Sequence, residues 1–378
     1  MERNDHPFYL KTTIVLFGLV LFVYIITSLQ DILIPIVFAG VIGILLNPLV
    51  NRLQANRVPK LLSILLGMLI GFLVIAGVLY FLSSQIIRFG ETLPLLQAKF
   101  TELLHDLQVW VTSSFGISLT RQVEILNNAL SSGQAMLGRT VGSVVGTIGL
   151  IFLIPVYVFM ILFYKTLFIN FFFEVFEEYY QQVDQVMGET KSAIQSYMVG
   201  LLMEACIVAA LQATALTILG VDYAILFGVI GGILNLLPYV GNIIATILPL
   251  LMATVTKDGY STHLGILAAY AFIQFLDNNI LVPRIVSSKV KINAFISIVA
   301  VLLGGAAWGI PGLFLSIPFV AIMKIIFDRV DSLKPWGRLL GDDVPGEHKG
   351  MLKDKVETDQ SVAEEIVEES REKPEDEK

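Results

Sequence analysis

The residues of this sequence that could do chemistry are ionisable and polar side chains inside apolar stretches. Glu204 lies near the middle of residues 192–221, which otherwise lack Asp, Glu, Lys and Arg. A charged group at membrane depth costs at least ~2.5 kcal/mol, so Glu204 is expected to face a protein interior or water. Spacings of four predict a small and polar stripe on one helix face: Ser196, Gly200, Glu204, Val208 and Gln212. Glu204 is either a proton- or cation-binding group or a protonated packing residue.

A second polar group stands at the end of the apolar stretch 260–276. Tyr270, Gln274 and Asn278 have the spacing of one helix face, and Asp277 is expected to cap the helix end. Asn279, Pro283 and Arg284 follow. The group is interpreted either as part of a transport pathway or as a plain loop start, with Arg284 as a cytoplasmic positive charge.

Two uncharged stretches, 223–256 and 292–323, are too long for one untilted span and contain helix-breaking residues. The first holds Asn235, Pro238, Tyr239, Gly241 and Asn242, and the second holds Gly309, Pro311 and Gly312. Non-helical backbone at membrane depth is tolerated only where it is buried in protein or lines a watery cavity. Paired broken segments are typical of transporter sites, although a simple kink remains the alternative for each.

The composition indicates that these residues lie in a membrane protein. Of 378 residues, 55% are hydrophobic and 15% are charged, which is too apolar for an ordinary soluble domain. Four further stretches, 12–30, 32–51, 61–87 and 140–164, are long enough to span a bilayer. The predicted fold is therefore an all-α integral membrane protein with about six full spans plus two broken segments that form hairpins, or with eight simple spans.

The expected organisation has six parts. They are three transmembrane helices (1–87), an extramembrane helical hairpin (88–139), a fourth transmembrane helix (140–164), an amphipathic interfacial helix (165–191), a transport core with broken helices (192–328) and an acidic, disordered tail (329–378). Basic residues in short loops place both termini in the cytoplasm. The basic loop 277–291 falls on the same side if 223–256 is a hairpin, and we favour that topology.

Charge and motif content exclude several classes of function. The net charge of −7 comes from the tail, since residues 342–378 hold 14 acidic and 6 basic residues and the rest of the chain carries +1. A nucleic-acid partner is therefore not expected. The single cysteine, Cys206, and four scattered histidines provide no metal, disulfide or haem motif, and no P-loop or catalytic serine motif is present. Neither an enzyme nor a cofactor is predicted.

Three blocks of sequence resemble a known family. They are Asn235-Leu236-Leu237-Pro238-Tyr239-Val240-Gly241, then Asp277-Asn278-Asn279-Ile280-Leu281-Val282-Pro283-Arg284, then Gly309-Ile310-Pro311-Gly312. Together they resemble the autoinducer-2 exporter superfamily of bacterial permease-like membrane proteins, over the chain up to about Asp328. The resemblance implies a homo-oligomer in the bacterial inner membrane that exports a small signalling molecule or exchanges Na⁺ or Li⁺ for protons. Asn242, Ser287 and Asn293-Ala294 depart from the family pattern, where proline, glycine and His-Pro are usual.

Three functions are compatible with these observations. The favoured one is an exporter of small polar signalling molecules or metabolites, gated by the broken segments around Pro238 and Pro311. The alternative is an Na⁺(Li⁺)/H⁺ antiporter that uses Glu204 or Asp277, and the third is a non-transporting membrane assembly protein. The expected partners are the lipid bilayer, a small-molecule or cation substrate and further copies of the chain.

Overall fold

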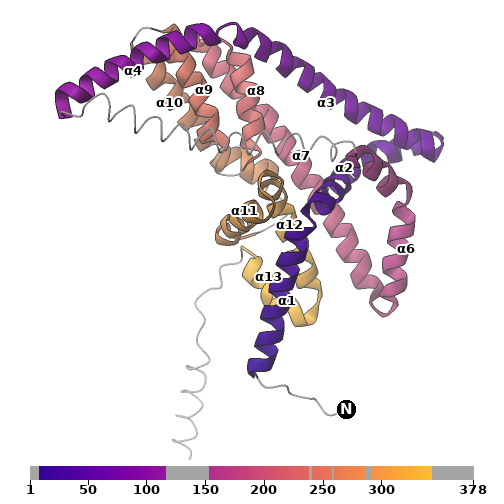
Figure 1. Cartoon of the computed structure of the whole chain (residues 1–378). Coiled ribbons are helices and arrows are strands. Elements are labelled where there is room, and N and C mark those ends of the chain that lie inside the picture. Colours follow the sequence, from indigo (N-terminus) through magenta and orange to yellow (C-terminus); the bar gives the residue numbers. More distant parts are fainter. Residues whose placement is uncertain (1–7, 116–152, 238–240, 258, 287–291, 343–378) are drawn as a thin grey trace, which may run out of the picture.

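The computed structural model describes residues 8–115, 153–237, 241–257, 259–286 and 292–342. Within these ranges the chain is helical, with one isolated β-bridge between Ile292 and Gly341. The prediction of an all-α membrane protein is confirmed. Figure 1 shows the long helix α7 running diagonally through the molecule, and α8, α12, η2, α10, α2 and α6 pack against it.

The N-terminal part consists of α1 (Phe8–Ser28), α2 (Gln30–Ala55), α3 (Lys60–Gly90), α4 (Leu93–Phe115), an unlabelled helix (Leu153–Phe163) and α6 (Lys165–Val175). The C-terminal part consists of η1 (Glu177–Tyr179), α7 (Tyr180–Ile218), α8 (Ala224–Asn235), α9 (Gly241–Thr256), α10 (Ser261–Leu276), the π-helix η2 (Asp277–Val286), α11 (Ala294–Trp308), α12 (Ile310–Arg329), η3 (Asp331–Leu333) and α13 (Lys334–Leu340).

Among the described residues, five helices are long and apolar enough to cross a membrane: Gln30–Ala55, Lys60–Gly90, Glu177–Ile218, Ser261–Ile285 and Ile310–Arg329. The helix Leu153–Phe163 and α6 meet at 61° and add a sixth if they are counted as one span. Only Leu29 separates α1 from α2, so Asp31 lies in the first turn of α2. Large apolar side chains on α1 and α3 are exposed, as expected for surfaces that face lipid.

The overlong stretch 223–256 is folded as a hairpin. α8 and α9 run antiparallel, because Gly241 packs against the backbone of Leu234 and Ala245 packs against Gly231. The hairpin also returns to the end from which it started, since the Lys257 ammonium lies beside Gly220, just before α8. The turn at 238–240 lies outside the described residues.

The second broken stretch also contains a hairpin, formed by α11 and α12. Gly309 joins the two helices with φ +62°, a left-handed conformation that glycine adopts without strain. Gly304 and Gly312 face each other so closely that a Cβ on either would overlap the carbonyl of the other. Because neither glycine has a side chain, the backbones of α11 and α12 pack directly against each other.

The segment 165–191, predicted to be one interfacial helix, is divided. α6 ends at Val175, Phe176 leaves the helical conformation, and α7 begins at Tyr180 and continues into the membrane span. α7 has 39 residues, about 58 Å at 1.5 Å per residue, whereas a bilayer core is about 30 Å thick. Its first turns therefore extend beyond the hydrocarbon, which explains their polar side chains.

The start of the predicted tail, 329–378, is ordered as far as Asp342. Gly337 of α13 packs against Asp328, and the Asn293 side chain donates a hydrogen bond to the Leu339 carbonyl at 2.8 Å. The acidic part beyond residue 342 lies outside the described residues. Local sequence pattern does not reveal α13, because this short helix depends on contacts with Asp328 and Asn293.

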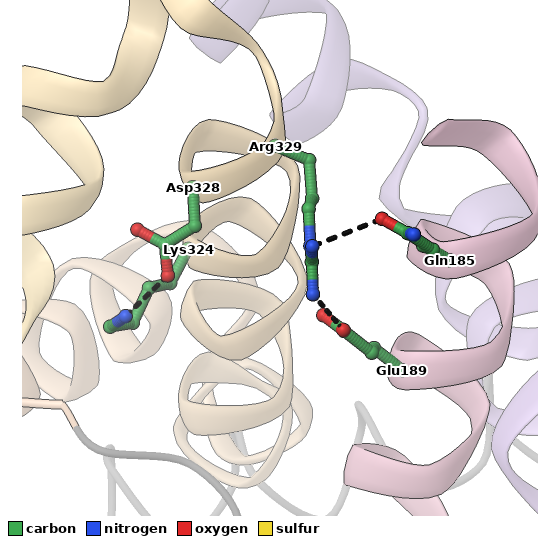
Figure 2. Close-up of polar contacts among 5 residues, drawn as sticks. All are labelled: Gln185, Glu189, Lys324, Asp328 and Arg329. Carbon is green, nitrogen blue, oxygen red and sulfur yellow. Dashed lines mark hydrogen bonds and ion pairs between the residues drawn. The ribbon is translucent and has the colours of Figure 1, made fainter. Parts of the chain in front are cut away.

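Polar contacts attach α12 to the extended start of α7. The Arg329 guanidinium donates to Gln185 at 3.0 Å and forms an ion pair with Glu189, as Figure 2 shows. On the neighbouring turn, Lys324 pairs with Asp328 within α12. These contacts bring the C-terminal hairpin and α7 together at the end of the molecule that carries α13.

Candidate functional site

The polar stripe predicted on α7 is buried. Glu204 is 5% exposed and Gln212 is fully buried. Val208, between them on the stripe, and Gly200, one turn before Glu204, are also buried. Ser196, the first member of the stripe, is only half-buried. The stripe faces α8, so the carboxyl group of Glu204 points into protein and not into lipid.

Glycines on α8 explain why this helix can lie so close to α7. A Cβ at Gly228 would meet the backbone of Ala213, and one at Gly232 would meet the Ala205 carbonyl at 2.4 Å. A Cβ at Gly231 would overlap the side-chain oxygen of Gln212. Small residues at such spacings let membrane helices pack backbone to backbone, and this packing holds the end of α8 at the level of Glu204.

Asn235, the last residue of α8, connects the two carboxyl groups that the sequence singled out. Its Nδ2 donates a hydrogen bond to Oε1 of Glu204 at 3.0 Å and another to Oδ2 of Asp277 at 3.3 Å. Asp277 is 3% exposed and begins η2. Residues from α7, α8 and η2 thus form one buried cluster, which we call the carboxyl cluster (Glu204, Asn235 and Asp277).

Each acid of the carboxyl cluster keeps one oxygen without a partner in the described structure. These atoms are Oε2 of Glu204 and Oδ1 of Asp277, and the other oxygen of each acid accepts its hydrogen bond from the same Asn235 amide. If both acids were ionised, their negative charges would repel strongly in a low-dielectric interior, because one neutral amide is their shared donor. The arrangement is suited to holding a proton or a cation between the two acids.

A second polar contact lies two helical turns further along α7. Nε2 of Gln212 donates to Oδ1 of Asn242, the second residue of α9, at 3.2 Å. The Gln212 Oε1 atom is buried and has no partner among the described residues. The contact places Asn242, a departure from the family pattern, beside the same face of α7 as Glu204.

The other predicted site residues occupy different positions. Gln274 donates to Asn278 at 3.0 Å, but Asn278 is exposed, and Pro283 and Arg284 are exposed on η2. Pro238 and Tyr239 lie outside the described residues. Of the three residues predicted to share a helix face, Tyr270 is buried, Gln274 is half-buried and Asn278 is exposed.

The second hairpin approaches the site through apolar contacts. Trp308, next to Gly309, belongs to the same hydrophobic cluster as Leu236 at the tip of the first hairpin and Leu201 of α7. The described close contact of Gly312 is with Gly304, within its own hairpin. Gly309, Pro311 and Gly312 thus shape the hairpin, and the part of the chain that the structure describes brings none of them into the carboxyl cluster.

Tyr270, the first residue of the predicted helix face, is a buried polar residue. It is 2% exposed and its hydroxyl has no partner in the described structure. Tyr270 and Asp277 are seven residues apart, two helical turns, which puts them on one face. Gln274 on that face is half-buried and Asn278 is exposed, so Tyr270 and Asp277 are its buried polar residues. Over the described ranges, no group of three or more His, Cys, Asp or Glu side chains is arranged to hold a metal ion.

The helices, the hairpins and the buried polar stripe define a multi-span membrane protein of the transporter class. Residues 13–332 match the sequence profile of the AI-2E family transporters, and the chain therefore belongs to this family. It is 27% identical to the AI-2 transport protein TqsA of Escherichia coli (strain K12) over 345 residues, which cover 88% of this chain and 96% of TqsA.

Two relatives from Bacillus subtilis (strain 168), both provisionally named as transport proteins, are similarly distant. YueF is 24% identical over 334 residues, covering 83% of this chain and 89% of YueF. YrrI is 23% identical over 310 residues, covering 79% of this chain and 86% of YrrI. The similarity extends over most of each chain and supports transport as the general function.

Proposed function

We propose that the protein is a secondary transporter of small polar solutes in which the carboxyl cluster binds and releases a proton during each transport cycle. The observation that carries this proposal is the bridge from Asn235 to Glu204 and Asp277. Transport needs a group that changes its charge or ligand as the protein changes conformation. Two acids that share one amide donor meet that need, because a proton gained or lost changes their mutual repulsion.

The location of the bridge on a hairpin tip supports the same proposal. Asn235 ends α8, and the chain leaves the helical path just beyond it, so movement of the hairpin would break the hydrogen bonds to both acids. Discontinuous helices near the bilayer midplane hold substrate and coupling ions in several transporter folds. We propose that hairpin movement and protonation of the carboxyl cluster occur together.

The name of one relative and the chemistry of α7 support the solute class that we propose. TqsA is named as a transporter of AI-2, and a small polar molecule of that kind would find hydrogen-bonding groups at Gln212 and Asn242. Export is the direction we propose. Inner-membrane location, cytoplasmic termini and assembly of several copies of the chain also belong to this proposal.

Cation/proton antiport is a second candidate, favoured by the two unpartnered oxygens on Glu204 and Asp277. Na⁺ and Li⁺ are hard cations that prefer carboxylate and amide oxygens. In this candidate, one cation replaces the shared proton in the cluster, and no organic solute is needed.

Reconstituted vesicles distinguish the two candidates. Glu204→Gln and Asp277→Asn each remove a titrating group while they preserve shape, and we expect both variants to lose proton-driven accumulation of a radiolabelled polar solute. Asn278→Ala, at an exposed position one residue away, is the control and should transport normally. Proton flux that depends on added Na⁺ or Li⁺ without any solute would favour antiport. Wild-type coupling in both acid variants would contradict both candidates.

A further inference from the structure

Three lysines from separate parts of the sequence converge near the ends of α2 and α3. Lys60 is the first residue of α3, Lys165 is the first residue of α6, and Lys191 lies in the extended part of α7. Figure 1 shows α6 leading into the start of α7, and the two helices pack against each other. Nζ of Lys60 donates to the carbonyl of Phe163, two residues before Lys165, and α6 packs against α7, the helix that carries Lys191. The charges of Lys60 and Lys191 both act on Lys165. We call these three residues the lysine cluster.

Neutral groups hold the lysine cluster in place. Nζ of Lys165 donates to Oδ1 of Asn47, which is 5% exposed, at 3.0 Å. Nζ of Lys60 donates to the Phe163 carbonyl at 2.7 Å and lies 5.1 Å from the centre of the Phe163 ring. These partners fix the positions of two ammonium groups without neutralising them.

The lysine cluster also lacks acidic partners among the described residues. The ion pairs of the described residues include none of Lys60, Lys165 and Lys191, and the hydrogen bonds of Lys60 and Lys165 are to neutral groups. Glu189, two residues before Lys191, is already paired with Arg329. Three like charges held together in this way attract an anion, which would remove their mutual repulsion.

The surface that follows Lys165 is apolar. Leu167, Phe168, Phe171 and Phe172 of α6 all expose large hydrophobic side chains. A ligand that fits both surfaces has an anionic head and a hydrocarbon chain. We infer that Lys60, Lys165 and Lys191 bind the phosphate of an anionic phospholipid whose acyl chains lie along the exposed face of α6. Basic pockets between transmembrane helices recognise phospholipid head groups in this way.

The phosphate chemistry is shared with free phosphate, but the aromatic face of α6 favours the lipid. A soluble phosphate would use the ammonium groups and leave Phe168 and Phe172 without a role. The inference concerns lipid recognition by the lysine cluster and does not depend on which solute the carboxyl cluster serves.

Native mass spectrometry of the purified full-length protein tests this inference. Phosphatidylglycerol is titrated against phosphatidylcholine, which has the same chains and no net charge. We expect selective retention of phosphatidylglycerol, and the double variant Lys165→Gln with Lys191→Gln should weaken it about tenfold or more. The matched control, Lys99→Gln with Lys257→Gln, removes the same charge elsewhere and should bind as wild type does. Lys165→Arg with Lys191→Arg keeps the charge and should restore most of the binding.

Two further measurements make the outcome decisive. Millimolar inorganic phosphate should not displace bound phosphatidylglycerol, and Phe168→Ser with Phe172→Ser should weaken lipid retention while the lysines remain. Equal retention of phosphatidylglycerol by the wild type and the Lys165→Gln, Lys191→Gln variant would overturn the inference. So would full displacement by inorganic phosphate, because the cluster would then be a site for a soluble anion.

Discussion

Asn235 connects the two acids on which the proposed function depends. Its amide is the donor that both Glu204 and Asp277 use in the described structure, and both acids are buried. A buried polar group without a partner costs about 1–3 kcal/mol. Asn235 therefore contributes both to stability and to the distance between the two acids.

Replacing Asn235 with alanine tests its contribution to stability. We expect Asn235→Ala to destabilise the protein by about 1–3 kcal/mol, because each acid loses its amide donor inside the protein. Thermal unfolding in detergent, followed by tryptophan fluorescence, measures the change. Asn278→Ala removes a surface amide that pairs with Gln274 and should change stability by less than about 0.5 kcal/mol. Equal effects of the two variants would mean that the bridge contributes little.

At the scale of the elements, the contact between α7 and α8 depends on the absence of side chains. Gly228, Gly231 and Gly232 place α8 against the backbone and the Gln212 side chain of α7. Without this close approach, the end of α8 could not reach Glu204. The same principle forms the α11–α12 hairpin, where Gly304 faces Gly312.

A pair of glycine substitutions tests the role of this packing. Gly232→Ala would place a Cβ at 2.4 Å from the Ala205 carbonyl, and the resulting overpacking should cost about 1–3 kcal/mol. Gly77→Ala lies in α3 with nothing within 4 Å of its Cβ, so the better helix propensity of alanine should stabilise it by up to about 1 kcal/mol. Melting temperatures of the two variants should therefore move in opposite directions. A common shift would refute the packing argument.

At the scale of the whole molecule, the α8–α9 hairpin determines which residues share a side of the membrane. Lys257 lies beside Gly220, at the far end of α7 from Lys191 and the first turns that extend beyond the bilayer. Arg57 precedes α3 and lies near the lysine cluster. The membrane-length helix α3 begins at Lys60, and near its other end the Arg88 carbonyl accepts a hydrogen bond from Tyr223, just before α8. We therefore expect Arg57 and Lys257 on opposite sides of the membrane.

Cysteine labelling in vesicles of known orientation tests this topology. In a Cys206→Ala background, Arg57→Cys and Lys257→Cys should react with a membrane-impermeant maleimide from opposite sides. We expect the Arg57 position to be cytoplasmic, following the basic residues around it. Reaction of both positions from one side would contradict the hairpin and favour a single crossing by residues 223–256.

The sequence by itself determined the class of fold and many of the candidate residues. Long uncharged stretches predict membrane spans because lipid excludes charge and unpaired backbone groups. Proline and glycine indicated the broken segments, and Glu204 became a candidate because it is an ionisable residue in the middle of an apolar stretch. Segment 165–191 is divided between α6 and α7, and α13 follows Arg329. Short helices such as α6 and α13 depend on contacts that local pattern does not reveal.

Only the tertiary structure decided which of these residues meet. Glu204 and Asp277 appeared in the sequence as separate candidates, and the structure joins them through Asn235. It likewise gathers Lys60, Lys165 and Lys191 into one cluster. The reason is physical. Hydropathy and helix breaks are local properties of the chain, whereas contacts between α7, α8 and η2 depend on which helix faces fit closely enough to bury their polar groups together.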